Sequence, residues 1–175
     1  MKKFLTASAV LIGVGLSSLA LAVDGTIAIK GEVSSSTCGI ESNFINQAVQ
    51  LEPVSQSSLA PGQNAGLKPF LIALTNCAAG TKIKTHFEFG PNVDPTTGTL
   101  KNQLTGADAS NVVVQLFNSD QQPIRVGNDT NLKEGTADSN GEAVMSFFAA
   151  YLAPAGETIK PGQVSTSVTY TMSYE

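Results

Sequence analysis

Residues 162–175 carry the clearest alternation of apolar and polar side chains in the sequence. The apolar side chains share one parity, with Thr166 as the exception, and Ser or Thr occupies most of the other parity. The apolar positions are Val164, Val168, Tyr170, Met172 and Tyr174. A period of two residues predicts a β-strand with one apolar face and one hydroxyl-bearing face. Because an open apolar edge invites aggregation, we expect this strand to have a neighbour on each side.

Residues 23–30 alternate in the same way near the other end of the chain. Val23, Gly25, Ile27 and Ile29 share one face, while Ala28 and polar residues share the other. Two interpretations fit this pattern. The segment is either an edge strand of its own domain, or a strand that extends freely because nothing before it holds it in place.

Between these two segments, the pattern predicts further strands separated by turn-rich connections. Residues 67–76 are apolar on both faces, which is typical of a central, buried strand. In residues 81–89 the odd-numbered side chains, as far as Phe89, are expected to point inward, and His86 outward with the charged residues. The other predicted strands are 44–51, 111–117, 124–126 and 143–152. About seven to nine strands and no convincing helix after residue 22 predict an all-β, immunoglobulin-like sandwich.

Residues 1–22 have the composition of a secretory signal peptide. Lys2 and Lys3 precede a mostly apolar core, and residues 19–22 read Leu-Ala-Leu-Ala, which fits a small-residue cleavage site. A membrane anchor is the alternative, but the apolar core is short for a span and ends in a processing signal. We expect a mature chain of 153 residues that begins at Val23 and leaves the cytoplasm.

Charge and composition exclude some classes of function. Without Lys2 and Lys3 the chain keeps 8 basic residues against 14 acidic ones, a net charge of −6. No basic surface for nucleic acid is therefore expected. A chain of about 150 residues is long enough for one domain with a core of its own.

Cys38 and Cys77 are the two cysteines of the chain. In an oxidising compartment we expect them to form one disulfide, which would close a loop of about 40 residues and contribute roughly 4 kcal/mol through chain entropy. A metal pair or a reactive thiol is the alternative. His86 is the single histidine and no Cys-x-x-Cys is present, which makes a metal site a poor fit.

No motif in the sequence indicates catalysis. The chain has no Gly-x-Ser-x-Gly, His-Glu-x-x-His or phosphate-binding loop. Its carboxylates are scattered over predicted loops and wet faces, and the pattern brings no pair of them together. We therefore expect that the protein is not an enzyme and that it has no catalytic residue, metal ligand or cofactor.

Four short motifs follow one another along the chain. They are Lys30-Gly-Glu-Val33 followed by Thr37-Cys38; the strand 70–77 ending in Asn76-Cys77; Phe147-Phe-Ala-Ala-Tyr-Leu152; and a terminus with Gly162 fourteenth from the end and Tyr174 next to last. In this order, behind a signal peptide, they resemble the motifs of the chaperone–usher (type 1 fimbrial) pilin subunits. The resemblance spans nearly the whole mature chain.

This resemblance implies a fold and a mechanism. Pilins of the family are incomplete immunoglobulin-like β-sandwiches that lack their last strand, which leaves a groove beside the C-terminal strand. A periplasmic chaperone lends a strand to the groove, and at the outer-membrane usher the N-terminal extension of the next subunit replaces it. Such donor-strand complementation is a known case of strand addition. The products are head-to-tail fibres at the cell surface, used in adhesion.

The family's functional positions can be transferred to this sequence residue by residue. The resemblance implies a pilin domain at 31–175 and a donor-strand extension at 23–30, which is short, about seven residues before Lys30 if cleavage follows Ala22. The donor residues would be Val23, Gly25, Ile27 and Ile29. The acceptor groove, also used by the chaperone, would be lined by Gly162, Val164, Val168, Tyr170, Met172 and Tyr174, with Glu175 held by basic residues of the chaperone.

Three other classes of protein are alternatives to a fimbrial shaft subunit. A fimbrial tip adhesin carries a separate receptor-binding domain, for which 153 residues leave no room. A minor or adaptor subunit of a fimbria is the harder alternative to separate, although a polar, low-charge, single-domain subunit of this size fits a shaft subunit best. A self-contained secreted β-sandwich binding module, with residues 23–30 paired inside their own domain, is the remaining alternative.

Overall fold

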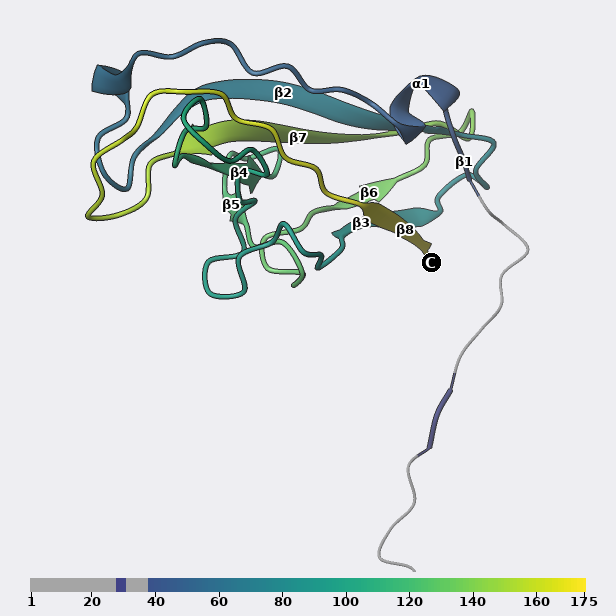
Figure 1. The fold of residues 1–175 in the computed structure, drawn as a ribbon. Coiled ribbons are helices and arrows are strands. Elements are labelled where there is room, and N and C mark those ends of the chain that lie inside the picture. Colours follow the sequence, from purple (N-terminus) through teal and green to yellow (C-terminus); the bar gives the residue numbers. More distant parts are fainter. Residues whose placement is uncertain (1–27, 31–37) are drawn as a thin grey trace, which may run out of the picture. The chain divides into compact units, whose positions relative to one another are not determined.

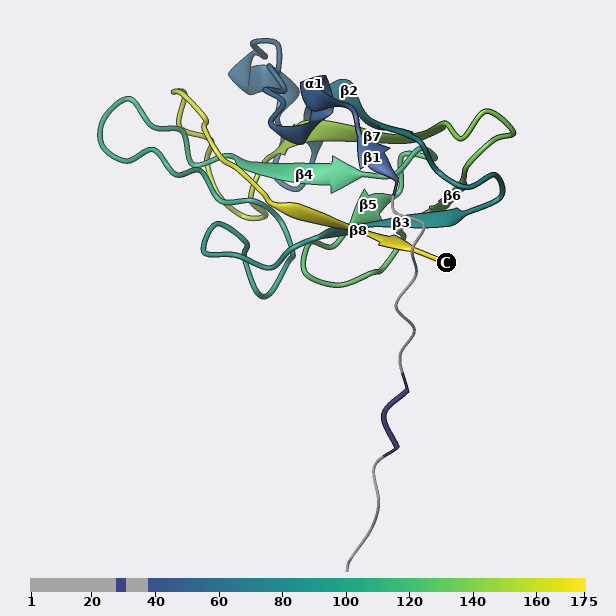
Figure 2. The same ribbon diagram turned by 90° about the vertical axis from the view of Figure 1, so that its right-hand side faces the viewer.

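The computed structural model describes residues 28–30 and 38–175. The chain divides into two units, residues 1–33 and 34–175. In the first unit, residues 28–30 are exposed and have no regular secondary structure. The second unit is a sandwich of two antiparallel sheets, with β2 and β7 in one layer and β3 and β8 in the other (Figures 1 and 2). The predicted all-β sandwich is thereby confirmed.

The two sheets contain eight strands within the described part of the chain. The strands are β1 (Gly39–Ile40), β2 (Asn64–Thr75), β3 (Lys82–Phe87), β4 (Val113–Phe117), β5 (Pro123–Ile124), β6 (Glu134–Thr136), β7 (Ala143–Leu152) and β8 (Tyr170–Tyr174). One sheet has the order β1-β2-β7-β4-β5 and the other the order β6-β3-β8. The helical elements are α1 (Ser42–Ile45) and a 3₁₀ turn at Gln56–Ser58. No helix among the described residues is long and apolar enough to cross a membrane.

The core lies between the two sheets and follows from the alternation of side chains along β2, β3 and β7. Phe70 lies opposite Phe147 in the β2–β7 ladder, and Phe87 approaches both rings, with centroid distances of 5.1 to 6.5 Å. Edge-to-face and offset contacts of this kind stabilise a core beyond the area they bury. Ile72 and Ile83 next to these rings are almost completely buried. β2 lies between β1 and β7, so its predicted inner position in the sheet is confirmed. The predicted burial of both faces is wrong, because Leu67 is 41% and Leu71 36% exposed.

The predicted disulfide is present. Cys38 and Cys77 are bonded, and the bridge links the start of β1 to the end of β2, where Gly39 pairs with Thr75. A two-residue ladder alone would hold β1 weakly. The covalent bond therefore fixes the beginning of the sandwich to its central strand.

Two predictions about single segments are wrong. Residues 44–51 do not form a strand: α1 occupies the first of them, and residues 47–51 are irregular because no neighbouring strand pairs with them. Phe89 does not point inward. The strand β3 ends at Phe87, and the Phe89 ring is 60% exposed and lies against Gly127, where a Cβ atom would come within 2.8 Å of it.

Candidate docking groove

The backbone of the terminal segment is hydrogen-bonded along one edge only. Odd-numbered residues pair with the loop before β4 and with β3: Gln163 exchanges bonds with residues 108 and 110, Thr169 accepts from Glu88, and Glu175 exchanges bonds with Lys82. In an antiparallel ladder, successive residues direct their N–H and C=O groups to opposite edges. The even-numbered residues therefore direct theirs to the other edge, where no described strand pairs with them.

The even-numbered side chains face the interior of the sandwich but are incompletely covered. All six are half-buried and none is fully buried, whereas the odd-numbered neighbours are mostly exposed. They are Val164, Thr166, Val168, Tyr170, Met172 and Tyr174. The hydroxyl of Thr166 is buried and has no hydrogen-bond partner among the described residues, which is costly for a polar group. This face of the terminal segment therefore lacks the packing contacts that one more strand would supply.

A groove runs along this open edge. It consists of two adjoining cavities of about 390 and 400 Å³, which share Gln50, Leu51, Tyr151 and Val164. The terminal segment forms one wall through residues 164–170, and residues 47–51 form the other. The floor of the first cavity is the core itself, with Phe70, Ile72, Phe87, Leu100, Val114, Leu116 and Ala149. An extended segment laid in the groove would complete the core.

The second wall continues along the second cavity as far as Val54, and residues 47–54 are held by few contacts. Within the described part of the chain, none of its backbone groups makes a backbone–backbone hydrogen bond. The side-chain amide of Gln47 donates to the Leu71 backbone carbonyl at 2.9 Å, and Glu52 forms an exposed ion pair with Lys68 at 3.0 Å. At the end of the wall, the Tyr170 hydroxyl donates to the carbonyl of Phe44 at 2.9 Å and closes the groove there.

The first wall is held in place by side chains of the loop before β4. The Asn102 amide nitrogen donates to the carbonyls of Ser110 and Gln163 at 2.9 and 2.8 Å, while its oxygen accepts from the amides of Leu104 and Ser165. Gly162 lies against the backbone of the same loop, and a Cβ atom there would be 2.5 Å from the Asp108 carbonyl oxygen. Glycine at this position is therefore explained by close approach of two backbones.

The groove is uncharged. None of the described residues that line its two cavities is Asp, Glu, Lys, Arg or His. Tyrosine is protonated at neutral pH; burial raises the pKa of the Tyr170 hydroxyl further, and burial followed by the charge of Glu52 does the same for Tyr151, so neither phenol brings a charge into the groove. Such a groove suits an apolar segment that supplies backbone hydrogen bonds, and ionic strength is expected to matter little for its occupation.

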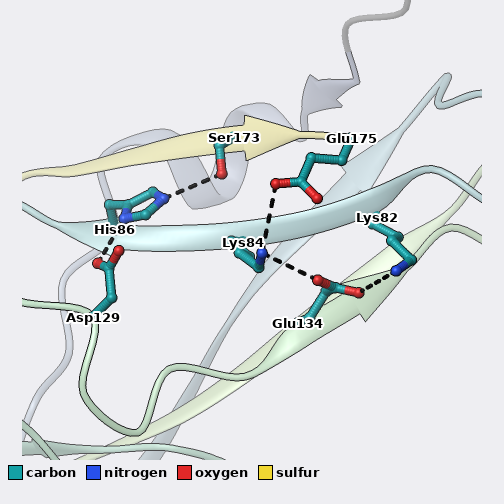
Figure 3. A network of polar contacts seen from close by, with 7 residues as sticks. All are labelled: Lys82, Lys84, His86, Asp129, Glu134, Ser173 and Glu175. Atoms are coloured by element: carbon teal, nitrogen blue, oxygen red, sulfur yellow. Dashed lines mark hydrogen bonds and ion pairs between the residues drawn. The ribbon is translucent and has the colours of Figure 1, made fainter.

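Charged residues gather instead on the outer face of the three-stranded sheet (Figure 3). Glu134 bridges Lys82 and Lys84, and Lys84 also reaches Glu175 at 3.5 Å. The hydrogen bond with Glu134, and then the charge of Glu175, raise the pKa of Lys84. His86 lies between Asp129 and Ser173, at 2.7 and 3.1 Å, on the wet face where the pattern predicted it. These exposed pairs connect the edge strand β8 to β3 and to the β6 region.

The structure brings some of the predicted site residues together and separates others. Val164, Val168 and Tyr170 line the first cavity and Gly162 the second, whereas Met172 and Tyr174 pack on the main core beyond the closed end. Glu175 directly follows β8 and pairs with Lys84 on the charged face. Of the donor residues, Val23, Gly25 and Ile27 lie outside the described residues, and Ile29 has an exposed side chain.

Two groups of groove residues were not predicted from the sequence. Residues 47–51 were interpreted as a strand, although they form the loosely held wall. Leu59 and Ile159 line the second cavity from a turn and from a connection. Each of these two residues stands two positions before a Pro-Gly pair, and an apolar side chain at that place in a polar connection was the signal that could have pointed to it.

Comparison with known proteins establishes the class of this protein. Residues 27–175 match the model of the family "Fimbrial protein". The chain belongs to the fimbrial protein family, as its sequence motifs indicated, and it is a fimbrial subunit.

Two relatives illustrate the extent of the similarity. The major fimbrial subunit SMF-1 of Stenotrophomonas maltophilia is 41% identical over 161 residues, which cover 87% of this chain and 94% of that protein. The fimbrial subunit type 1 of Klebsiella pneumoniae is 31% identical over 176 residues, 95% of each chain.

Solved structures share the fold. The P pilus rod subunit PapA superposes with a TM-score of 0.61 at 19% identity, over 79% of this chain and 99% of that one. A subunit of a chaperone–usher pilus gives a TM-score of 0.58 at 18% identity, over 86% and 95% of the two chains. These similarities confirm the pilin-type sandwich.

Proposed function

We propose that this subunit polymerises head-to-tail by donor-strand exchange, as a structural component of a chaperone–usher fimbria used in adhesion. Residues 1–22 act as the signal peptide, residues 23–30 as the donor strand and residues 31–175 as the pilin domain. The observation that carries the proposal is the open groove beside residues 164–170, whose even-numbered backbone groups lack a partner strand. No catalytic role is part of the proposal.

The chemistry of the donor segment fits that of the groove. Val23, Ile27 and Ile29 share one face of an extended segment and would bury their side chains over Phe70 and the core, each contributing about 1.5–3 kcal/mol. Each ladder hydrogen bond to the open edge adds about 0.5–1.5 kcal/mol net. Asp24 and Lys30 fall on the other face and stay out of the uncharged groove.

Head-to-tail use of such a groove generates a fibre. The donor strand and the groove are different surfaces of the same chain, so the contact is heterologous and does not close into a pair. Copies of this chain, or of related pilins, are the partners within the fibre. The P pilus protein, which shares the fold, is itself a rod subunit.

Before assembly, the same groove is expected to hold a strand of a periplasmic chaperone, which the next subunit replaces at an outer-membrane usher. A sandwich with its core open along one edge would otherwise aggregate in the periplasm. Glu175, exposed at the end of β8, is the group we assign to basic residues of the chaperone. The fibre then reaches the cell surface.

The test compares the mature protein with a form that lacks residues 23–30. The truncated form is expected to bind one added peptide of sequence 23–30 and to be stabilised by it, while the full mature chain forms fibres. A matched peptide with Ile27→Asp and Ile29→Asp should not bind, because both charges would enter an apolar groove. A truncated form that is stable alone and ignores the peptide would contradict the proposal.

A further inference from the structure

Three side chains on the outer face of the three-stranded sheet are linked by hydrogen bonds (Figure 3). The Nδ1 atom of His86 is 2.7 Å from a carboxylate oxygen of Asp129, and its Nε2 atom is 3.1 Å from the hydroxyl oxygen of Ser173. A carboxylate, an imidazole and a serine hydroxyl connected in this order are the arrangement of a serine nucleophile with its general base. The groove does not use these groups, because none of the three lines either of its cavities.

The two hydrogen bonds determine where the protons lie when the imidazole is neutral. A carboxylate can only accept, so the bond to Asp129 places the proton of the ring on Nδ1. Nε2 is then an acceptor, and the Ser173 hydroxyl donates to it. In this tautomer His86 is ready to take the hydroxyl proton. Asp129 acts on the hydroxyl only through His86, which makes it a positioning residue.

Paired strands hold the hydroxyl and the imidazole in place. His86 belongs to β3, and Ser173 belongs to β8, where it lies directly opposite Lys84. His86 and Ser173 are therefore diagonal neighbours on one face of the ladder, a separation that a side chain as long as histidine spans. Asp129 comes from the connection between β5 and β6. The nucleophile and its base thus stand on rigid elements, which favours a defined geometry.

Lys84 places a positive charge next to the hydroxyl. It lies opposite Ser173 in the ladder, where the Cβ atoms of paired residues are about 4.5–5.5 Å apart. Lysine is charged at neutral pH, and the hydrogen bond with Glu134, followed by the charge of Glu175, raises the pKa of Lys84 further. A cation beside an attacked carbonyl group stabilises the negative oxygen of the tetrahedral intermediate. Because Glu134 and Glu175 share this ammonium group, its effect is partly neutralised.

We propose that Ser173 is a site of acylation, with His86 as its general base and Asp129 as the positioning residue. The acyl donor is a carboxylic ester with a good leaving group. The Ser173 oxygen bonds to the carbonyl carbon, and its proton passes to Nε2 of His86. The carbon–oxygen bond of the donor ester then breaks, and the alcohol leaves with that proton. The products are a chain esterified at Ser173 and the free alcohol.

The exposure of the three groups defines the kind of donor. The side chain of His86 is 33% exposed and that of Asp129 65%. Groups this open to solvent do not enclose an acyl chain, so donors are expected to differ by the reactivity of their leaving group rather than by chain length. A site open to water stabilises charge weakly, which makes acylation and hydrolysis of the new ester slow. One acyl group per chain is therefore the expected product.

The experiment adds p-nitrophenyl acetate to the purified mature chain and locates the acetyl groups by mass spectrometry of its peptides. Ser167 is the control within the same chain. It is an exposed serine on the same parity of the terminal segment, and its hydroxyl accepts from the Asn92 side chain instead of contacting a histidine. The variants are His86→Gln, which keeps a polar side chain but offers no base, Asp129→Asn and Asp129→Glu. Guanidinium unfolding checks that each variant is folded.

Ser173 is expected to be acetylated about 100-fold faster than Ser167, because a general base contributes about 10²–10⁴-fold in rate, and His86→Gln should remove this difference. Asp129→Asn should slow the acetylation of Ser173, and Asp129→Glu should restore part of the rate, which a merely structural role would not produce. Acetylation of Ser173 at the rate of Ser167 would overturn the inference, as would a rate that His86→Gln leaves unchanged. Should His86→Gln fail to fold, the comparison of the two serines in the wild-type chain still decides, because it needs no variant.

Discussion

Replacement of Gly162 by Ala should destabilise the terminal segment strongly. The added Cβ would lie 2.5 Å from the Asp108 carbonyl oxygen and 2.8 Å from two further backbone atoms, at Ala109 and Ser110. Backbone cannot rotate away as a side chain can, so one of the two segments must move. Overpacking of this kind costs about 1–3 kcal/mol.

The movement would also break hydrogen bonds. The Gln163 amide donates to the Asp108 carbonyl at 2.7 Å, and the Gln163 carbonyl accepts from the Ser110 amide at 3.0 Å. Each contributes about 0.5–1.5 kcal/mol, so the expected total loss is about 2–6 kcal/mol of the free energy of unfolding. Because Val164 follows directly, the affinity of the groove for the 23–30 peptide should fall as well.

The assay is guanidinium unfolding with the disulfide intact, which gives the free energy of unfolding from the midpoint and the slope. Gly156→Ala is the matched control. Gly156 has a positive φ of 77° but no heavy atom within 4 Å of an added Cβ, so its variant reports about 1–2 kcal/mol of backbone strain without a collision. If Gly162→Ala were no less stable than Gly156→Ala, the close-approach argument would be wrong.

Four further predictions concern two hydrogen-bonding residues of the groove, the disulfide and one carboxylate in a loop. Tyr170→Phe removes the hydrogen bond to the Phe44 carbonyl and should cost about 0.5–1.5 kcal/mol in chemical unfolding, with faster amide exchange at residues 47–51. Asn102→Ala removes four hydrogen bonds and should cost about 2–6 kcal/mol, whereas Asn140→Ala, which removes one side-chain bond of 3.4 Å on an exposed turn, should cost less. Replacing both Cys38 and Cys77 by Ser should cost about 4 kcal/mol, measured as a lower guanidinium midpoint. Hydrogen bonds from the backbone amides of Thr97 and Thr96 lower the pKa of the Asp94 carboxyl group. The stability that this carboxylate contributes is therefore fully present above the ordinary carboxyl pKa and is lost as the pH falls through the lowered pKa. Asp94→Asn should remove this loss, which would appear as a flatter acid side of the curve of unfolding free energy against pH.

The sequence predicted best those segments whose own apolar side chains decide their burial. β7 has the predicted bounds, Ala143–Leu152, because it is a strongly apolar run; its burial alternates as far as Ala149, and Ala150 is buried as well. β6, at Glu134–Thr136, was not predicted, because three polar residues carry no apolar pattern and pair only by virtue of β3 beside them.

Parity predicted which residues of the terminal segment face the groove, but not how far the groove extends. Met172 and Tyr174 share the parity of Val164 and Val168 and yet lie beyond its end. That end is set by the hydrogen bond from Tyr170 to Phe44, two residues 126 positions apart in the chain. A contact of that range leaves no local pattern, and the same holds for residues 47–54, which form a wall without belonging to a ladder.

The two sides of the groove differ in what their displacement costs. Moving residues 47–54 outward breaks the hydrogen bond from Gln47 to Leu71 and one exposed ion pair, whereas moving the terminal strand breaks its whole ladder with β3. Thermal opening of the free subunit is therefore expected on one side only. The kinetics of strand replacement would then be governed by a segment that never pairs with either strand, and evolution could tune the speed of assembly there without altering the stability of the finished polymer.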